Sequence, residues 1–250
     1  MKVTFLGTGT SHGVPMLGCD CRVCKSSDSR NRRTRPSVLI QGSAQIVIDS
    51  GTDFRSQIMR HPISRLDAVL FTHWHADHIL GLDDIRPFNY WQKGAIPIYG
   101  NARTLQRIRE TFSYIFDGTS HEGAPKVEAR AIDGPLDING MRIEPLEIIH
   151  GRLAILGFRI SNFAYITDAS FIPEETIRRI RNVDCVVLNA LRHTPHFAHF
   201  SVNQAVEQIG KIQPRQAFLT HISHQLDHEE VERSLPPQVR LAYDGLTLEL

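Results

Sequence analysis

The sequence lacks an apolar run long enough to cross a membrane. A spanning helix needs roughly 18 or more apolar residues in succession, and no window of the 250-residue chain approaches that length. The first apolar run, residues 3–6, is cut short by Gly7 and Thr8, and no small-residue cleavage site of a secretory signal follows it. These absences predict a chain that has no membrane partner, is not exported and works in the cytoplasm.

Net charge is almost absent as well. The 28 basic and 27 acidic residues leave a formal charge of +1, so the chain as a whole offers no bulk attraction to a nucleic acid or a membrane surface. The sequence also contains no internal repeat, low-complexity tract or Pro/Gly-rich linker. We therefore expect residues 1–250 to form a single domain.

Cysteine is scarce, and its distribution is uneven. Three of the four cysteines crowd into Cys19-Asp20-Cys21-Arg22-Val23-Cys24, whereas Cys185 lies in a distant apolar run. Three cysteines that close cannot all pair with one another, and the cytosol keeps thiols reduced, so the cluster indicates metal binding rather than disulfides.

The apolar pattern indicates the α/β class. Short β-type runs bounded by turn residues cover residues 3–6, 37–40, 45–48, 68–71, 96–99, 142–147, 157–160, 164–166, 185–188, 216–219 and 247–250. Helical spacing occurs at residues 53–59, 102–114, 174–180, 201–209 and 228–234. Ser201 and Gln204 have the spacing of a capping box, and Pro173 with the two following acids suits a first helical turn.

Four potential metal ligands stand within Thr72-His73-Trp74-His75-Ala76-Asp77-His78, directly after the apolar run 68–71. In an extended chain His73 and His75 project to the same side. A turn or helix start after them would let Asp77 and His78 face a neighbouring point. Two adjacent ligand pairs of imidazoles and carboxylates suit two adjacent metals such as zinc.

This segment resembles the signature of the metallo-β-lactamase superfamily, and the resemblance covers nearly the whole chain. The other motifs are Gly7-Thr8-Gly9-Thr10-Ser11, Ile46-Val47-Ile48-Asp49-Ser50-Gly51, His150 after a β-run, Tyr165-Ile166-Thr167-Asp168 and Phe218-Leu219-Thr220-His221. The resemblance implies a four-layer αββα sandwich and a hydrolase that uses two divalent metals, zinc or manganese, to activate water.

The resemblance also implies which residues hold each metal. His73, His75 and His150 would hold the first metal, Asp77, His78 and His221 the second, and Asp168 would bridge both. Two metals about 3.5–4 Å apart lower the pKa of a water between them, and Asp77 is expected to serve catalysis as well as binding. Asp49 resembles the carboxylate that orients a ligand histidine. A turn role before Gly51 is an equal alternative for Asp49.

The cysteine cluster resembles a feature of one branch of the superfamily, which includes the cyclic-phosphate phosphodiesterase of the carbon–phosphorus lyase pathway. In that pattern Cys19, Cys21 and Cys24 hold a structural zinc together with a histidine three residues after the last active-site histidine, here His224. His228 is a weaker alternative for the fourth ligand.

A late histidine in phosphodiesterase branches reaches the phosphate as a donor or general acid. The resemblance favours His199, immediately before the capped helix, with His196 as its nearest competitor and His193 the next. In the same branch pattern, Asp83, Asp84 and Arg86 are expected to brace a loop beside the site through an ion pair, with substrate contact by Arg86 as the alternative.

Three functional hypotheses follow. The favoured one is a phosphodiesterase that acts on a small, nucleotide-like diester, either linear or cyclic. A tRNA 3′-processing ribonuclease shares the metal ligands, but the chain has no long Gly/Pro-containing arm to grip tRNA, and the cluster Arg30, Arg32, Arg33 and Arg35 is more typical of a solvated loop. The third is a metal-binding protein without catalysis. Relatives suggest a homodimer.

Overall fold

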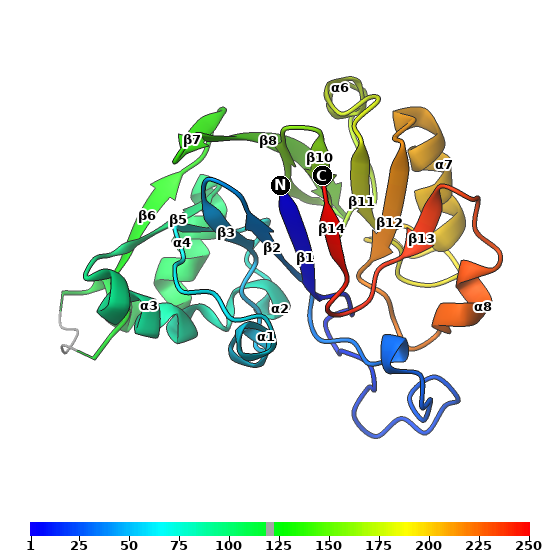
Figure 1. Ribbon diagram of the computed structural model, residues 1–250, viewed down its shortest axis with the longest axis horizontal. Coiled ribbons are helices and arrows are strands. Elements are labelled where there is room, and N and C mark those ends of the chain that lie inside the picture. Colours follow the sequence, from blue (N-terminus) through cyan, green and yellow to red (C-terminus); the bar gives the residue numbers. More distant parts are fainter. Residues whose placement is uncertain (119–122) are drawn as a thin grey trace.

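The computed structural model describes residues 1–118 and 123–250, and in these residues two mixed β-sheets of seven strands each face one another. The first sheet has the strand order β14-β1-β2-β3-β4-β5-β6 (Figure 1). Its strands are β1 (Lys2–Gly7), β2 (Ser37–Gln41), β3 (Gln45–Ile48), β4 (Ala68–Leu70), β5 (Ile96–Gly100), β6 (Val127–Ala131) and β14 (Thr247–Glu249).

The second sheet has the order β13-β12-β11-β10-β9-β8-β7. Its strands are β7 (Leu136–Ile138), β8 (Met141–His150), β9 (Leu153–Ile160), β10 (Phe163–Tyr165), β11 (Cys185–Asn189), β12 (Gln216–Thr220) and β13 (Val239–Leu241). Strands β3, β4, β5 and β6 run parallel in the first sheet, and β10, β11, β12 and β13 run parallel in the second.

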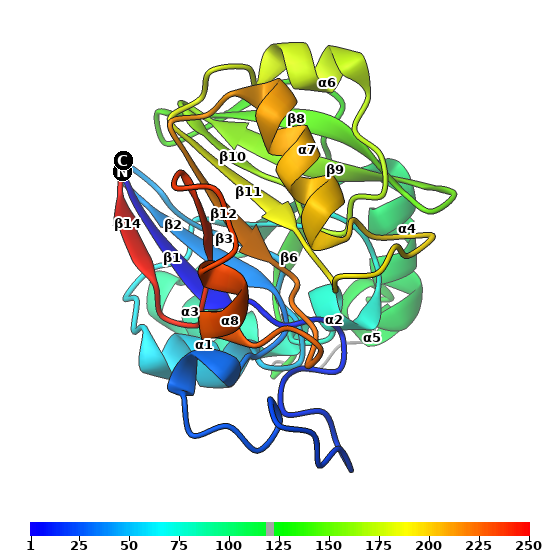
Figure 2. The ribbon, with the colours of Figure 1, turned by 90° about the vertical axis from the view of Figure 1, so that its right-hand side faces the viewer.

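Helices cover the outer face of each sheet, as Figures 1 and 2 show from two directions. On the first sheet these are α1 (Phe54–Arg60), α2 (Ala76–Ile79), α3 (Arg86–Gln92), α4 (Ala102–Thr111) and α5 (Ser113–Phe116). On the second they are α6 (Glu174–Arg179), α7 (Val202–Ile212) and α8 (His228–Glu232). Among the described residues, every helix is too short or too polar to span a membrane.

Three apolar layers hold the sandwich together because strand side chains alternate between faces. Ile46 and Ile48 of β3 lie between the sheets with Phe158 and Val187. Val47 of the same strand points outward, into the cluster that contains Phe54 of α1. A third cluster packs α6, α7 and α8 on the outer face of the second sheet. The predicted αββα sandwich is therefore confirmed.

The structure corrects several predicted elements. Strand β6 was not predicted because its sequence, VEARA, has low β-propensity. The strand lies at the exposed edge of the sheet and pairs with β5. Strands β7 (LDI) and β13 (VRL) were also missed, because each has a charged residue between two apolar ones and so forms no apolar run. The predicted helix 102–114 is two helices, α4 and α5, that break at Phe112, and α3 forms where a loop was expected. Pro173 caps α6 rather than entering its first turn, whereas the capping box of Ser201 and Gln204 is confirmed.

The arginine cluster is not a solvated loop throughout, because Arg33 is only 3% exposed. Its guanidinium donates to the Thr8 hydroxyl at 2.8 Å, to the Ala242 carbonyl at 2.6 Å and to Nδ1 of His228 at 3.0 Å. Arg30 and Arg35 pair with Asp28 and Asp53. These contacts tie the segment before β2 to α8, so they account for Arg33 and His228 as parts of the fold.

His228 makes stability depend on pH. Burial and the nearby Arg33 lower the pKa of His228 to about 4. Between pH 6.5 and 4 the His228 imidazole is protonated in the unfolded chain but stays neutral in the folded one. The free energy of unfolding therefore falls as the pH falls through that window. His228→Gln removes the titration and keeps an acceptor for Arg33. Urea unfolding at pH 7 and pH 5 is expected to show a smaller loss in this variant than in the wild type, and an equal loss would contradict the assignment. Exposed His193→Gln is the control.

Candidate metal centre

Strand ends bring the predicted site residues together. Parallel strands place their carboxyl ends at one edge of a sheet, so Asp49 after β3 lies beside Thr72 after β4, and Asp168 after β10 lies near His221 after β12. Asp49, Asp168 and His221 all have positive φ angles, of 62°, 58° and 57°. Such backbone strain in non-glycine residues is concentrated at functional sites, and here it turns three side chains inward.

A glycine allows the close approach of the segment that carries Asp77. A β-carbon at Gly51 would lie 2.0 Å from the Asp77 carbonyl oxygen, too close for any side chain. The Ser50 amide donates to the His78 carbonyl at 2.8 Å, and the Gly81 amide donates to the Ser50 carbonyl at 2.8 Å. The turn after β3 therefore fixes the short helix α2.

The first ligand group contains His73, His75 and His150, whose nearest ring nitrogens all lie within 4.8 Å of one another. Nε2 of His73 is 2.9 Å from Nδ1 of His75. Nδ1 of His150 donates to the Ala198 carbonyl at 2.7 Å, which leaves Nε2 of that ring without its proton and free to act as a ligand.

The second group contains Asp77, His78 and His221, again with ligand atoms within 4.8 Å. Nε2 of His78 lies 3.3 Å from Asp77 Oδ2, and Nε2 of His221 lies 3.7 Å from the same oxygen. Nδ1 of His78 contacts Asp49 Oδ2 at 2.7 Å, and Thr72 holds both Asp49 oxygens. Asp49 thus contacts a candidate ligand histidine, as the first of its two predicted roles requires.

Asp168 lies between the two groups. Its Oδ2 is 3.3 Å from Nε2 of His78, and its Oδ1 is 3.1 Å from Nε2 of His221. A carboxylate oxygen of Asp168 also lies within 4.8 Å of a ring nitrogen of His73 and of His150. Asp168 is therefore the candidate ligand that both groups have in common.

Buried ring nitrogens without hydrogen-bond partners show that the donor set fits divalent cations. Nε2 of His78 and Nε2 of His221 are buried without such a partner, which is costly unless a cation completes their coordination. Burial by itself would raise the pKa of Asp168, but His221 and His78 outweigh it and hold that pKa well below its ordinary range. Burial disfavours a charged His78, yet Asp77 and Asp49 raise its pKa well above the ordinary value. The carboxylates of the site therefore favour positive charge among them, and metal binding would displace the proton of His78.

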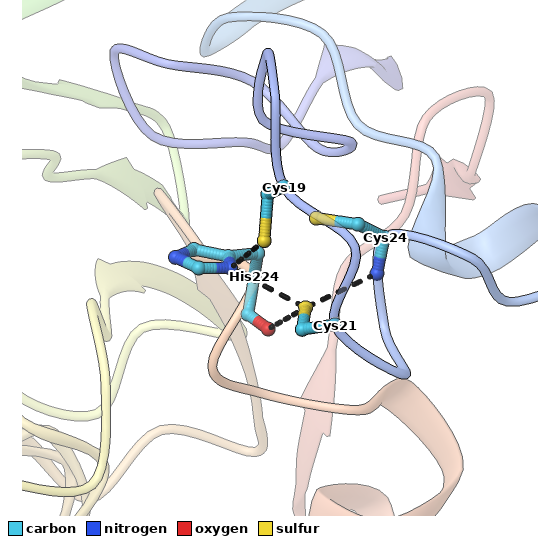
Figure 3. A group of neighbouring side chains, drawn as sticks. All are labelled: Cys19, Cys21, Cys24 and His224. Carbon is cyan, nitrogen blue, oxygen red and sulfur yellow. Dashed lines mark hydrogen bonds between the residues drawn. The ribbon is translucent and has the colours of Figure 1, made fainter.

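The cysteine cluster forms a second group of candidate ligands, Cys19, Cys21, Cys24 and His224, with ligand atoms within 4.8 Å of one another (Figure 3). Nδ1 of His224 is 3.3 Å from Cys19 Sγ and 3.4 Å from Cys21 Sγ. The Cys24 amide and His224 lower the pKa of the Cys21 thiol to about 6, whereas burial raises that of Cys24 to about 11. The Ile222 amide donates to the Thr8 carbonyl, and the Thr10 amide donates to the Ile222 carbonyl. These hydrogen bonds place the segment that carries His224 beside the cysteine loop. Three sulfurs and one imidazole are a ligand set of structural zinc sites.

The comparisons with known proteins decide the family. A model of the β-lactamase superfamily domain matches residues 44–222. The chain is a metallo-β-lactamase superfamily member. This chain superposes on the crystal structure of a new diphosphatase from the PhnP family with a TM-score of 0.94 and 42% sequence identity. The match covers 100% of this chain and 97% of that one. Zinc-bound PqqB from Methylobacterium extorquens superposes with a TM-score of 0.83 at 20% identity, with all of both chains covered.

The superfamily member spans about half the length of the curated relatives that it matches. It is 39% identical to an octanoyltransferase of Porphyromonas gingivalis over 252 residues. This alignment covers 98% of this chain and 51% of that protein. It is 26% identical over 163 residues to a coenzyme PQQ synthesis protein B of Xanthomonas axonopodis pv. citri, covering 59% and 52% of the two chains.

Of the three late histidines considered, His193, His196 and His199, it is His199 that lies beside Asp168 and His221. Its Nδ1 lies 3.5 Å from Asp168 Oδ1, and its ring stacks on His221 with centroids 4.7 Å apart. His196 lies further out, 5.2 Å from the His199 ring, and His193 is exposed. Burial and the neighbouring His221 lower the pKa of His199 to about 3, so its imidazole is neutral near pH 7.

The predicted brace at Arg86 is wrong in its details. Among the described residues Arg86 forms no ion pair with Asp83 or Asp84 and donates instead to the Gly123 carbonyl at 2.8 Å, while Asp83 accepts from the Tyr114 hydroxyl.

Sequence reasoning also missed the Ala198 carbonyl that orients His150. No side-chain pattern signals a backbone contact, and only the position of Ala198 next to His199 could have suggested it.

Proposed function

We propose that this chain is a hydrolase of small phosphodiesters that holds two divalent cations, zinc or manganese, at the active site and one structural zinc at the cysteine cluster. The observation that carries the proposal is the convergence of two three-residue ligand groups on Asp168. The 42% identity to a diphosphatase supports phosphoryl chemistry, and the zinc of PqqB supports that metal in this fold.

Each group of residues at the site has its own proposed role: cation binding, orientation of the ligand imidazoles, or proton donation. His73, His75 and His150 would hold one cation, Asp77, His78 and His221 the other, and Asp168 both. Cations bound there lower the pKa of water and neutralise phosphoryl charge. The Asp49 carboxylate and the Ala198 carbonyl keep two ligand imidazoles in the required orientation. His199, as a neutral imidazole with one N–H, is placed to donate to a phosphoryl oxygen or to the leaving oxygen.

A metal-replete screen tests the proposal. Protein purified without chelator is analysed for zinc and manganese, then assayed with bis(p-nitrophenyl) phosphate, small cyclic phosphodiesters and a tRNA precursor. Turnover of small diesters with an untouched precursor is the expected result. Cleavage of the precursor alone would favour a processing ribonuclease instead, and full metal content without turnover of any substrate would indicate a binding protein.

His199→Ala is expected to lower kcat/KM for bis(p-nitrophenyl) phosphate about ten- to a hundredfold, the range for one hydrogen bond to a charged group. Its metal content should match the wild type, because the proposed ligand groups remain complete. The exposed His193→Ala variant is the matched control and should keep wild-type activity. Loss of metal in His199→Ala would instead make His199 a ligand.

A further inference from the structure

A pocket of about 280 Å³ lies between α3 and the segment that leads into β6. Three cationic residues line it, Arg86, Lys93 and Lys126. Among the described residues that form the lining, none is acidic. The pocket shares no residue with the candidate metal ligands or with the surroundings of His199, so its positive charge needs an explanation of its own.

The sequence of α3 places part of this lining on one side of the helix. Arg86, Tyr90 and Lys93 stand at positions i, i+4 and i+7, and residues with this spacing share a helix face. Lys126 comes from a later part of the chain and reaches the pocket only through the fold. The positive charge therefore comes from two separate segments.

A buried asparagine holds these two segments together. Asn89 is 9% exposed. Its Nδ2 donates to the Gly94 carbonyl at 2.9 Å and to the Lys126 carbonyl at 2.8 Å, and its Oδ1 accepts from the Lys126 amide at 3.0 Å. The backbone that carries the cationic side chains is therefore fixed before any ligand arrives.

The three cations have no carboxylate partners in the part of the chain that the structure describes, whereas surface arginines such as Arg178 and Arg233 pair with glutamates. Arg86 donates through Nη1 to the Gly123 carbonyl at 2.8 Å, which engages one of the five N–H donors of a guanidinium. Like charges gathered at one pocket repel one another. A bound anion would relieve that repulsion.

Charge and donor number indicate which anion fits. A carboxylate carries a single negative charge, whereas a phosphate monoester carries about −1.5 to −2 at pH 7 and has three acceptor oxygens. Two lysines and one arginine match the larger charge, because lysine binds phosphate as a point charge and arginine through paired N–H groups. The volume lies just below the roughly 300–1,000 Å³ of pockets for drug-sized ligands, so it suits a small one.

We propose that the pocket formed by Arg86, Lys93 and Lys126 is a second anion site, which binds a phosphate monoester outside the metal centre. The monoester is either a small dissolved molecule or the headgroup of a lipid. The inference goes beyond the proposed function and does not depend on it, because the site binds its ligand without reaction.

Nuclear magnetic resonance of the zinc-loaded protein tests this site separately from the metal centre, because the backbone amide of Gly94 reports on the pocket alone. Inorganic phosphate or sn-glycerol 3-phosphate, added at constant ionic strength, should shift the Gly94 signal to saturation. Lys93→Gln/Lys126→Gln should raise the Kd about tenfold or more, as expected when two hydrogen bonds to a charged group are lost. Lys2→Gln/Arg55→Gln removes the same charge from two other exposed positions and should keep the wild-type Kd.

Vesicles distinguish the two sources of the phosphate. The protein is sedimented with phosphatidylcholine vesicles that contain or lack phosphatidic acid. Co-sedimentation that requires phosphatidic acid and is lost in Lys93→Gln/Lys126→Gln would assign the site to a lipid headgroup. Saturation by the dissolved compounds without co-sedimentation would assign it to a small molecule.

Three results would overturn the inference. One is the absence of both a saturable Gly94 shift and co-sedimentation in the wild type, which needs no variant. Another is an equal Gly94 shift with chloride at the same ionic strength, which would show only general attraction of anions. The third is an unchanged Kd in Lys93→Gln/Lys126→Gln.

Discussion

Asp168→Asn is expected to lower kcat/KM for bis(p-nitrophenyl) phosphate by more than about a hundredfold. Loss of a residue that merely orients a metal ligand already costs about 10- to 100-fold, and Asp168 lies within 3.3 Å of ligand nitrogens of both His78 and His221. The amide keeps the shape of the side chain but removes the charge that two cations would share. Elemental analysis should therefore show fewer active-site cations per chain.

The control for this variant is Asp133→Asn, which removes the same charge from an exposed turn. It should retain both the metal content and the activity of the wild type. Full metal content and full activity in Asp168→Asn would show that this carboxylate is not shared by two cations. Loss of activity with complete metal content would assign Asp168 a role in the reaction rather than in binding.

Cys24→Ser is expected to remove one zinc per chain and to lower the free energy of unfolding by at least about 3 kcal/mol, because a structural zinc contributes about 10–16 kcal/mol of binding free energy in small zinc domains. For a chain of this size the melting temperature should fall by roughly 6–12 °C. Cys24 is 7% exposed and lies beside Cys21, whose Sγ accepts from the Cys24 amide. A serine there leaves a weaker ligand in a buried place.

Cys185→Ala provides the matched cysteine control. Cys185 is buried in β11, between the sheets, so its replacement costs some packing energy without touching the cluster. Its metal content should equal that of the wild type. If wild-type protein never exposed to chelator carries no more zinc than Cys24→Ser, the cysteine cluster is not a zinc site.

The sequence predicted the active-site segment better than the elements around it. His73, His75, Asp77 and His78 are local to one segment, and the alternation of an extended chain already places His73 and His75 on one side. His150, Asp168 and His221 were reached only through the family resemblance, because nothing in their own neighbourhoods indicates a shared partner. Strand β6 was missed because its pairing with β5, rather than its own residues, makes it a strand.

The sequence by itself determined the α/β class of this protein and the chemistry of its candidate ligands: alternating apolar residues define which faces of the strands are buried, and imidazole, carboxylate and thiol groups define what they can bind. Only the tertiary structure decided which ligands meet, that the Ala198 carbonyl orients His150, and that Lys126 joins Arg86 and Lys93 at one pocket. The physical reason is distance along the chain. Contacts between residues from 48 to 205 positions apart, such as His150 with Ala198 and Cys19 with His224, depend on how two sheets pack, and no local periodicity encodes that.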